Sequence, residues 1–242
     1  MPRKKVQKTE NAYRAHRERQ RHRILDAVWK LFGQRGIDRV TMAEITSASG
    51  VQPSTIYQYF ANKDDIVWAL LRETMQDFSG RVKHTLDAAP NALARITALF
   101  DFMADELENN RAKIRFMAQF DAMYAYDWPA KRLITLESQI NPDGFKVFSD
   151  LIRDGIADGS LRRDLDPNLT LHAVINGVIG AQRRLASLGN KIEREYGKPA
   201  DRLFRESIRV ILLGLRNPEF LAPRRPKRPR KAGKVRNRKR PS

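Results

Sequence analysis

The sequence lacks cysteine, has only four histidines and carries no recognisable catalytic motif. With no cysteine among 242 residues, disulfides and thiolate metal sites are excluded, and a reducing compartment such as the cytoplasm is expected. The four histidines are scattered, and none has metal-ligand spacing. No phosphate-binding loop or nucleophile motif is present, and neighbouring carboxylates such as Asp64 and Asp65 are typical of a helix's first turn. We therefore expect no catalysis, no metal and no cofactor.

Long apolar runs and alternating patterns are also absent. No window approaches the roughly 20 apolar residues that cross a bilayer. No apolar run follows the basic N-terminus, so we expect neither a membrane span nor a secretory signal. No stretch of useful length alternates apolar and polar residues, so we expect no β-sheet. The remaining signal is helical periodicity, which predicts an all-α fold of one large or two modest domains.

Positive charge is in excess, but only at the two ends of the chain. The formal net charge is +18, of which residues 1–23 carry +7 and residues 221–242 carry +11. Residues 24–220 hold 26 basic and 26 acidic side chains, so this part is electrically balanced. Basic tails on a balanced core favour an acidic partner such as nucleic acid, and solvated tails are the alternative.

Residues 41–63 predict two short helices joined by a tight turn. Thr41 and Glu44 have the spacing of a capping box at the start of the first helix. Gly50 supplies the left-handed residue that ends it, and Val51 fills the corner. This segment therefore has the outline of a helix-turn-helix unit.

The second helix of this unit, residues 53–60, has an unusual outward face. Ile56 and Phe60 are four residues apart and share the inward face. The outward face carries hydroxyls, amides and two aromatic rings instead of the Lys and Glu of a solvated helix. Such groups suit base edges and phosphates in a major groove. The candidate DNA-contacting residues are Thr41, Gln52, Pro53, Ser54, Thr55, Tyr57, Gln58, Tyr59 and Lys63.

Lys63 is included because it opens a third helix. Asn62 is placed to cap that helix, so a cation and free backbone amides converge where a phosphate could bind. The helix continues to about residue 87 with an apolar stripe.

Residues 24–71 resemble the DNA-binding domain of the TetR/AcrR family of one-component bacterial regulators. The spacing matches without a gap, and Thr46 and Ser49 stand where the family usually has alanines. The resemblance implies a three-helix DNA-binding domain, then a helical domain for effector binding and dimerisation. The matching residues are Ile24, Ala27, Leu31, Phe32, Gly36, Thr41, Ile45, Gly50, Val51, Thr55, Tyr57, Tyr59, Phe60 and Lys63.

We divide the chain into four parts on these grounds. Residues 1–17 form a basic arm expected to be disordered up to about residue 15, and residues 18–66 form the helix-turn-helix domain. Residues 67–220 form the helical effector-binding and dimerisation domain, and residues 221–242 form a basic, disordered tail. The second domain is predicted to contain helices at about 91–108, 112–124, 129–139, 142–156, 166–188 and 200–216.

The last two helices carry small residues on one stripe. Glycine inside a helix costs about 1 kcal/mol relative to alanine, so its presence indicates a close packing partner. The family resemblance implies dimerisation through these helices, and packing within one chain is the alternative. The candidate dimer-interface residues are Gly177, Gly180, Ala181, Leu203, Ser207, Val210, Ile211 and Gly214.

Residues 100–128 are rich in methionine and aromatic side chains. Such a stripe at helical spacing is most often plain core, but the same residues line pockets for varied apolar molecules. The resemblance places the effector pocket in this region. The candidate ligand-binding residues are Phe100, Met103, Phe116, Met117, Phe120, Met123, Tyr124 and Asn176, with Gln182 as a further polar contact.

Two functions are compatible with these observations. The first is a ligand-responsive repressor, a homodimer that binds a palindromic operator in double-stranded DNA and is released by a small-molecule effector. The second is an architectural protein that binds DNA of any sequence through its basic tails, because residues 221–242 suit sequence-independent phosphate binding. Salt dependence and competitor DNA distinguish the two.

Overall fold

The structure, a computed structural model, describes residues 3–87, 89–142 and 144–220. Within these residues the chain forms eleven α-helices and no strand, with one isolated bridge between Leu161 and Arg216. The N-terminal helices are α1 (Arg3–Arg35), α2 (Met42–Ser49), α3 (Pro53–Tyr59) and α4 (Lys63–Asp87). The others are α5 (Ala92–Asn109), α6 (Arg111–Met123), α7 (Ala130–Ile140), α8 (Gly144–Ala157), α9 (Pro167–Leu188), α10 (Asn190–Tyr196) and α11 (Ala200–Leu215).

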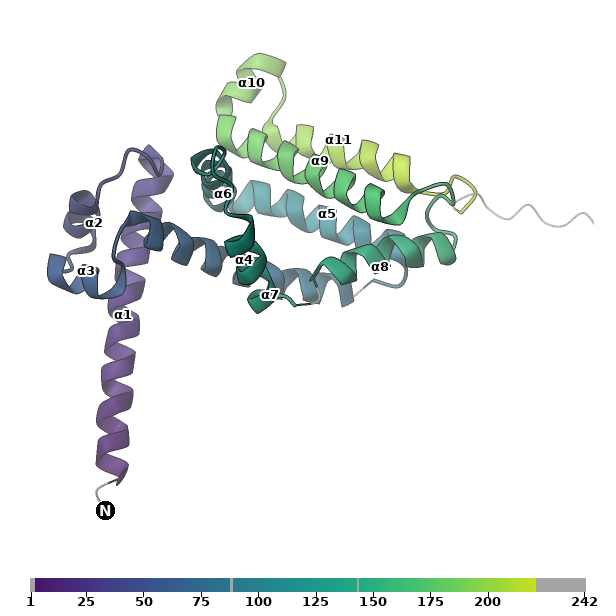
Figure 1. Cartoon of the computed structure of the whole chain (residues 1–242). Coiled ribbons are helices and arrows are strands. Elements are labelled where there is room, and N and C mark those ends of the chain that lie inside the picture. The colour runs from purple at the N-terminus through teal and green to yellow at the C-terminus, as the bar shows by residue number, and fades with distance from the viewer. Residues whose placement is uncertain (1–2, 88, 143, 221–242) are drawn as a thin grey trace, which may run out of the picture.

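The helices divide into an N-terminal helix-turn-helix domain and a C-terminal helical domain. Figure 1 shows α2 and α3 beside the long rod of α1, while α4 leads away into the second group of helices. In that group α5, α9 and α11 pack against one another, and α8 packs on α5 and α9. Helix α6 packs on α9, α5, α4 and α1. None of the described helices is both long enough and apolar enough to cross a bilayer. The predicted all-α fold is confirmed.

The first helix is longer than the sequence analysis expected. We expected no order before about residue 15, whereas α1 begins at Arg3. Residues 3–32 contain neither glycine nor proline and are rich in Lys, Arg, Gln, Glu and Ala, which favour helix. Helical structure therefore continues outward from the anchored part of α1, whose inward face begins at Ile24. The helix ends before Gly36, which has a φ of 88°.

One hydrophobic cluster holds the helix-turn-helix domain together. It joins α1, α2, α3 and the start of α4, and it also takes in Phe116 and Phe120 of α6 and Leu136 of α7. The two domains therefore share a core at their junction. Thr46 and Ser49, the departures from the family pattern, bond the carbonyls of Met42 and Thr46, so their hydroxyls are satisfied inside α2.

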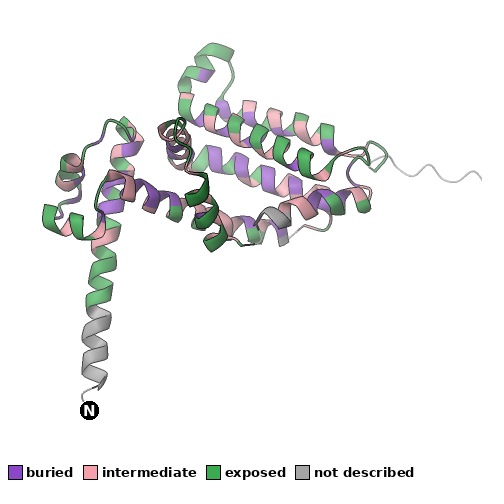
Figure 2. Ribbon diagram, viewed as in Figure 1, coloured by how far each residue is buried: buried purple, intermediate pink, exposed green. Residues whose placement is uncertain are grey.

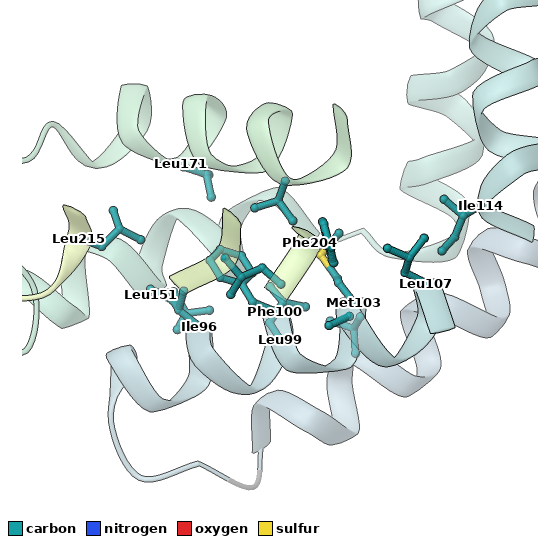
Figure 3. Close-up of a cluster of buried hydrophobic side chains, with 14 of the residues drawn as sticks. Ile96, Leu99, Phe100, Met103, Leu107, Ile114, Leu151, Leu171, Phe204 and Leu215 are labelled. Atoms are coloured by element: carbon teal, nitrogen blue, oxygen red, sulfur yellow. The ribbon is translucent and has the colours of Figure 1, made fainter. Parts of the chain in front are cut away.

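A second cluster fills the C-terminal domain, and Figure 3 shows its side chains converging from several helices. Phe204 of α11 and Leu107 of α5 are both 0% exposed. In Figure 2 the buried residues lie on the facing sides of α5, α9 and α11. Gly155 of α8 allows a close approach, because a Cβ there would lie 2.5 Å from the Leu161 side chain.

The predicted helix positions in this domain are confirmed to within about two residues. Two helices begin at side-chain N-caps. The Asn91 side chain accepts a hydrogen bond from the Ala94 amide at 2.9 Å, and the Asp166 carboxylate accepts from the amides of Asn168 and Leu169 at 2.9 and 2.8 Å. Helix α10 was not predicted. Its seven residues are too short for a periodic signal, and its one buried anchor is Ile192.

Candidate DNA-reading surface and internal cavity

The α2–α3 unit is fixed by the local bonds that the sequence predicts. The Thr41 hydroxyl accepts the Glu44 amide at 3.3 Å, and the Glu44 carboxylate accepts the Thr41 amide at 2.9 Å. Gly50 has the left-handed conformation, with φ 62° and ψ 22°. Arg35 donates to Glu44 at 2.6 Å and ties α1 to α2. The Thr41 amide and the Arg35 guanidinium lower the pKa of Glu44 to about 2.

Helix α3 is anchored by buried apolar side chains on its inward face and presents polar side chains on its outward face. Ile56 and Phe60 are buried, at 0% and 4% exposure, as predicted. No interaction occupies the side chains of Ser54 or Gln58 within the described chain. Gln52, Pro53, Ser54, Tyr57 and Gln58 are exposed, whereas Thr55 and Tyr59 are half-buried. Figure 2 shows this outer side of α3 as exposed, on the edge of the domain away from α4.

Tyr59 and Lys63 are more engaged within the protein than the sequence suggests. The Arg17 guanidinium lies 5.4 Å from the centre of the Tyr59 ring, so this ring packs beside α1. The Lys63 ammonium donates to the carbonyls of Ile37 and Asp38, at 3.0 and 3.5 Å. These carbonyls lie 26 and 25 residues earlier in the chain. Lys63 thus holds the α1–α2 loop against α4.

Basic side chains of α1 accompany the reading surface, by which we mean the exposed residues Gln52, Pro53, Ser54, Tyr57 and Gln58 at α3. Arg21 bonds Glu73 of α4 at 2.7 Å, and it fixes α1 against α4. The arginines that remain exposed between residues 13 and 35 are Arg14, Arg17, Arg19, Arg23 and Arg35. Arg35 is paired with Glu44, and Arg17 lies beside Tyr59 of α3. The other exposed arginines add positive charge along α1, which suits the phosphates that border a groove. The basic tail 221–242 lies outside the described residues.

A cavity of about 340 Å³ lies inside the C-terminal domain, walled by α4 to α9. Its size is at the lower end of the roughly 300–1,000 Å³ of small-molecule pockets. The apolar lining consists of Met75, Phe78, Val82, Met103, Ile114, Met117, Ile140, Phe148, Ile175 and Ile179. The polar and charged lining consists of Thr74, Asp77, Ser79, Arg81, Glu106, Lys113, Glu137, Asn141, Gln182 and Arg183.

Only part of the predicted ligand set lies at this cavity. Met103 and Met117 line it, as does Gln182, whose amide donates to the Met103 carbonyl at 2.7 Å. The walls from α4, α7 and α8 were not predicted from the sequence. Met75 and Phe78 of α4 were recognisable as an apolar stripe, but not as cavity wall.

The remaining members of the predicted ligand set lie elsewhere. Phe100 belongs to the core of the C-terminal domain, and Phe116, Phe120, Met123 and Tyr124 pack at the junction with the helix-turn-helix domain. Asn176 is exposed on α9 and bonds the His172 carbonyl at 2.8 Å. A stripe of methionines and aromatics does not indicate by itself which neighbouring domain it faces. These six residues therefore do not line this cavity.

A wider cleft of about 490 Å³ lies at the junction of the domains. Its lining includes Arg21, Arg72, Lys131 and Arg132, together with the Trp68 ring. The Arg132 guanidinium lies 3.9 Å from the centre of that ring. Five of the twelve residues that line this cleft are charged, whereas half of the residues that line the smaller cavity are apolar, so the cavity is the better small-molecule candidate.

Helix α6 touches both the cavity and the helix-turn-helix domain. Its Lys113, Ile114 and Met117 line the cavity. From other faces of the same helix, the Gln119 side chain accepts the Ile37 amide at 3.2 Å, and Arg115 donates to the Gly33 carbonyl at 3.2 Å. Helix α6 therefore contacts both the end of α1 and the loop that leads into α2.

Tyr124, which caps the end of α6, makes a further connection. Its hydroxyl accepts from the Trp68 indole at 2.9 Å and donates to the Asp64 carboxylate, both on α4. Burial, reinforced by the hydrogen bond to Asp64, raises the pKa of Tyr124 to about 12. Phe120 packs on Trp68 and Tyr124, with ring centres 5.4 and 4.6 Å away.

The predicted dimer-interface residues lie on α9 and α11, which pack against each other. Gly177, Gly180 and Gly214 are exposed, and a Cβ at any of them would meet nothing within 4 Å. Val210 is 57% exposed, and the same two helices expose Leu169 and Leu213. Ala181, Leu203, Ser207 and Ile211 are half-buried between the helices. This face combines open glycines with exposed apolar side chains.

The fold and the reading surface define a DNA-binding regulator of the helix-turn-helix class. Residues 24–70 match the family described as bacterial regulatory proteins, tetR family. The chain is 28% identical over 149 residues to the transcriptional repressor KstR2 of Mycolicibacterium smegmatis, an alignment covering 62% of this chain and 71% of that repressor.

Solved structures share the fold over about four fifths of the chain. A transcriptional regulator from Saccharomonospora viridis, in complex with choline, matches with a TM-score of 0.65 at 21% identity, covering 83% of this chain and 98% of that one. The regulator FadR of Bacillus subtilis, in complex with stearoyl-CoA, matches with a TM-score of 0.57 at 18% identity, covering 80% and 98%. The family match at residues 24–70, the relatives and the solved structures together support a transcriptional regulator of the TetR family.

Proposed function

We propose that this protein is a ligand-responsive repressor that binds a palindromic operator as a homodimer and leaves it when a small molecule occupies the internal cavity. The observation that carries the proposal is the exposed, uncharged face of α3, whose donors and acceptors have no partner within the described chain. Hydroxyls and amides on such a face can bond base edges directly. The related protein from M. smegmatis is itself named a repressor.

The residues proposed to read bases are those that α3 leaves free. Gln52, Ser54, Tyr57 and Gln58 are exposed, and the half-buried Thr55 lies on the rim. Thr41 lies at the start of α2, where its hydroxyl is used in the capping box. Pro53 fixes the first turn of α3. Tyr59 and Lys63 are proposed to act indirectly, by holding α1 and its loop in place.

A homodimer is proposed because one α3 reads too few bases to select an operator. The open glycine stripe of α9 and α11 would let two copies approach closely, and the exposed Val210 would be covered. A two-fold pair of α3 helices reads half-sites about one helical turn, roughly 34–36 Å, apart.

Helix α6 is proposed as the link between the ligand and the DNA. A ligand against Met117 and Ile114 would press on α6, whose Arg115 contacts the end of α1 and whose Gln119 contacts the loop before α2. The change in DNA affinity can be no larger than the ligand's difference in affinity between the two conformers. Two of the similar solved structures contain choline and stearoyl-CoA, which differ widely in chemistry, so similarity of fold does not indicate which ligand this protein binds.

The alternative function is an architectural DNA-binding protein. It is favoured by the concentration of all the excess charge in residues 1–23 and 221–242. Such a protein would bind every duplex with a steep salt dependence and no sequence preference.

Selection of bound fragments from the source genome tests the proposal. We expect enrichment of one near-palindromic motif, bound by two protomers, with at least about 10³-fold preference over unrelated DNA. Random recovery of fragments would refute repression through an operator and support the architectural function.

The dimer has a test of its own. Gly177→Leu adds a side chain where one protomer leaves open space, so the fold should be kept while the partner is pushed away. Gly80→Leu is the matched control, because Gly80 of α4 is equally open and lies outside this face. Analytical ultracentrifugation should give monomers for Gly177→Leu alone. Dimers in both variants would place the interface elsewhere.

A further inference from the structure

The charged residues around the internal cavity leave one carboxylate uncompensated. Arg81 of α4 donates to both oxygens of Glu106, at 2.6 and 2.7 Å, and to Asp77 at 3.1 Å. Lys113 of α6 donates to the same Asp77 at 2.8 Å. Every charged group contributed to the wall by α4, α5 and α6 is thus already paired with another.

The wall from α9 is neutralised in the same way. Arg183 is paired with Asp121 of α6, and Gln182 uses its amide on the Met103 carbonyl. No cation on the described cavity wall is therefore left to attract an anionic ligand. The remaining charged residue of the wall is Glu137 of α7.

Glu137 differs from all of these residues. Glu137 lines the cavity and is half-buried, and its carboxylate has no hydrogen-bond or ion-pair partner within the described chain. Burial raises the pKa of Glu137, since the charged form loses hydration without gaining a partner. An incoming group that carries a positive charge or donates a hydrogen bond would remove this penalty.

We propose that the cavity takes a molecule with an apolar body and one cationic nitrogen, the nitrogen pairing with the Glu137 carboxylate. The methionine and phenylalanine side chains of the wall, Met75, Met103, Met117, Phe78 and Phe148, would enclose the apolar body. The inference rests on the proposed function only in treating this cavity as the ligand site. It names the chemical class that the site prefers.

Three probes with nearly the same body separate charge from shape. They are 4-phenylbutylamine, 4-phenylbutanol and 4-phenylbutyrate, which are a cation, a neutral molecule and an anion at pH 7.5. Binding to the full chain without DNA is measured by titration calorimetry. A hydrogen-bonded charge pair contributes about 1.5–3 kcal/mol, so the amine should bind roughly ten- to hundredfold more tightly than the alcohol. The carboxylate should bind most weakly.

Glu137→Gln keeps the shape of the side chain and removes its charge. In this variant the affinity ratio of amine to alcohol should fall to about one, and the anion should bind better than before. Glu195→Gln is the control, because Glu195 is an exposed glutamate of α10 outside the cavity and should leave the order of the probes unchanged. Thermal melting of Glu137→Gln at or above the wild-type temperature verifies that the variant is folded.

Tightest binding of the anion, or an amine preference that survives Glu137→Gln, would overturn the inference, as would failure of the amine to bind. Because no DNA is present, the result does not depend on repression. If the amine binds through Glu137 but leaves DNA affinity unchanged, the cation preference stands and the proposed release mechanism fails.

Discussion

Tyr124→Phe tests how the two domains are joined, because it deletes a single hydroxyl at their junction. That hydroxyl accepts from the Trp68 indole and donates to the Asp64 carboxylate. A lost neutral hydrogen bond costs about 1 kcal/mol, and one to a charged group costs about 1.5–3 kcal/mol. Asp64 is 38% exposed, so water replaces part of the lost bonding. We expect a net loss of about 1–2 kcal/mol.

This loss of stability is measured by urea unfolding at pH 7.5, with tryptophan fluorescence as the signal. Tyr126→Phe is the matched control: Tyr126 lies two residues further on, is 104% exposed and should leave the midpoint unchanged. Equal midpoints for the wild type and both variants would refute the assigned role of the hydroxyl. So would equal losses in both variants, because Tyr126 has no contact to lose.

The pH dependence of the stability difference between the wild type and Tyr124→Phe provides a second check. The folded-state pKa of Tyr124 is raised to about 12 from an ordinary value of 10.0. The stabilisation by the neutral phenol is therefore complete below pH 10 and lost as the pH rises from about 10 to about 12. The gap between the wild type and Tyr124→Phe should narrow over this interval. A gap that widens would contradict the assigned bonding.

Three further outcomes follow from the structure. Gly155→Ala should destabilise the fold by about 1–3 kcal/mol in urea unfolding, because its Cβ would lie 2.5 Å from Leu161, and a neutral result would refute that close packing. The capping box should weaken only in acid, because the pKa of Glu44 is lowered from 4.5 to about 2. The stabilisation by the Glu44 carboxylate is therefore present above pH 4.5 and lost as the pH falls towards 2. Amide hydrogen exchange in α2 measures this loss. Deleting residues 221–242 should lower affinity for specific and scrambled duplexes equally and flatten the salt dependence, and loss of sequence preference alone would refute this.

Features set by neighbouring residues were predictable from the sequence. The capping box at Thr41, the left-handed Gly50, the buried Ile56 and the helix starts at Asn91 and Asp166 all follow from signals within a few residues. The reading helix could be identified for the same reason. Its inward anchors are four residues apart, and the polar character of its other face is visible in one turn.

Features set by long-range packing were not predictable. The partners of Lys63 are carbonyls in a loop 26 and 25 residues earlier, so no local pattern shows them. The cavity depends on which faces of six helices meet, and the aromatic stripe of α6 mostly faces the other domain. Asn176 is exposed, and which face of α9 packs on α5, α6, α8 and α11 is set by the tertiary structure. The unpaired state of Glu137 likewise appears only when all walls are in place.

The central claim is that α3 reads the DNA sequence, and the most direct measurement is the affinity ratio between the selected operator and a scrambled duplex of equal length. Thr55→Ala and Tyr57→Ala should each lower this ratio by about ten- to hundredfold, corresponding to about 1–3 kcal/mol per lost contact, while binding to the scrambled duplex hardly changes. Tyr196→Ala, at an exposed tyrosine of α10, should keep the wild-type ratio. If both α3 variants also keep the wild-type affinity ratio between operator and scrambled duplex, the surface that reads the DNA sequence lies elsewhere on the protein.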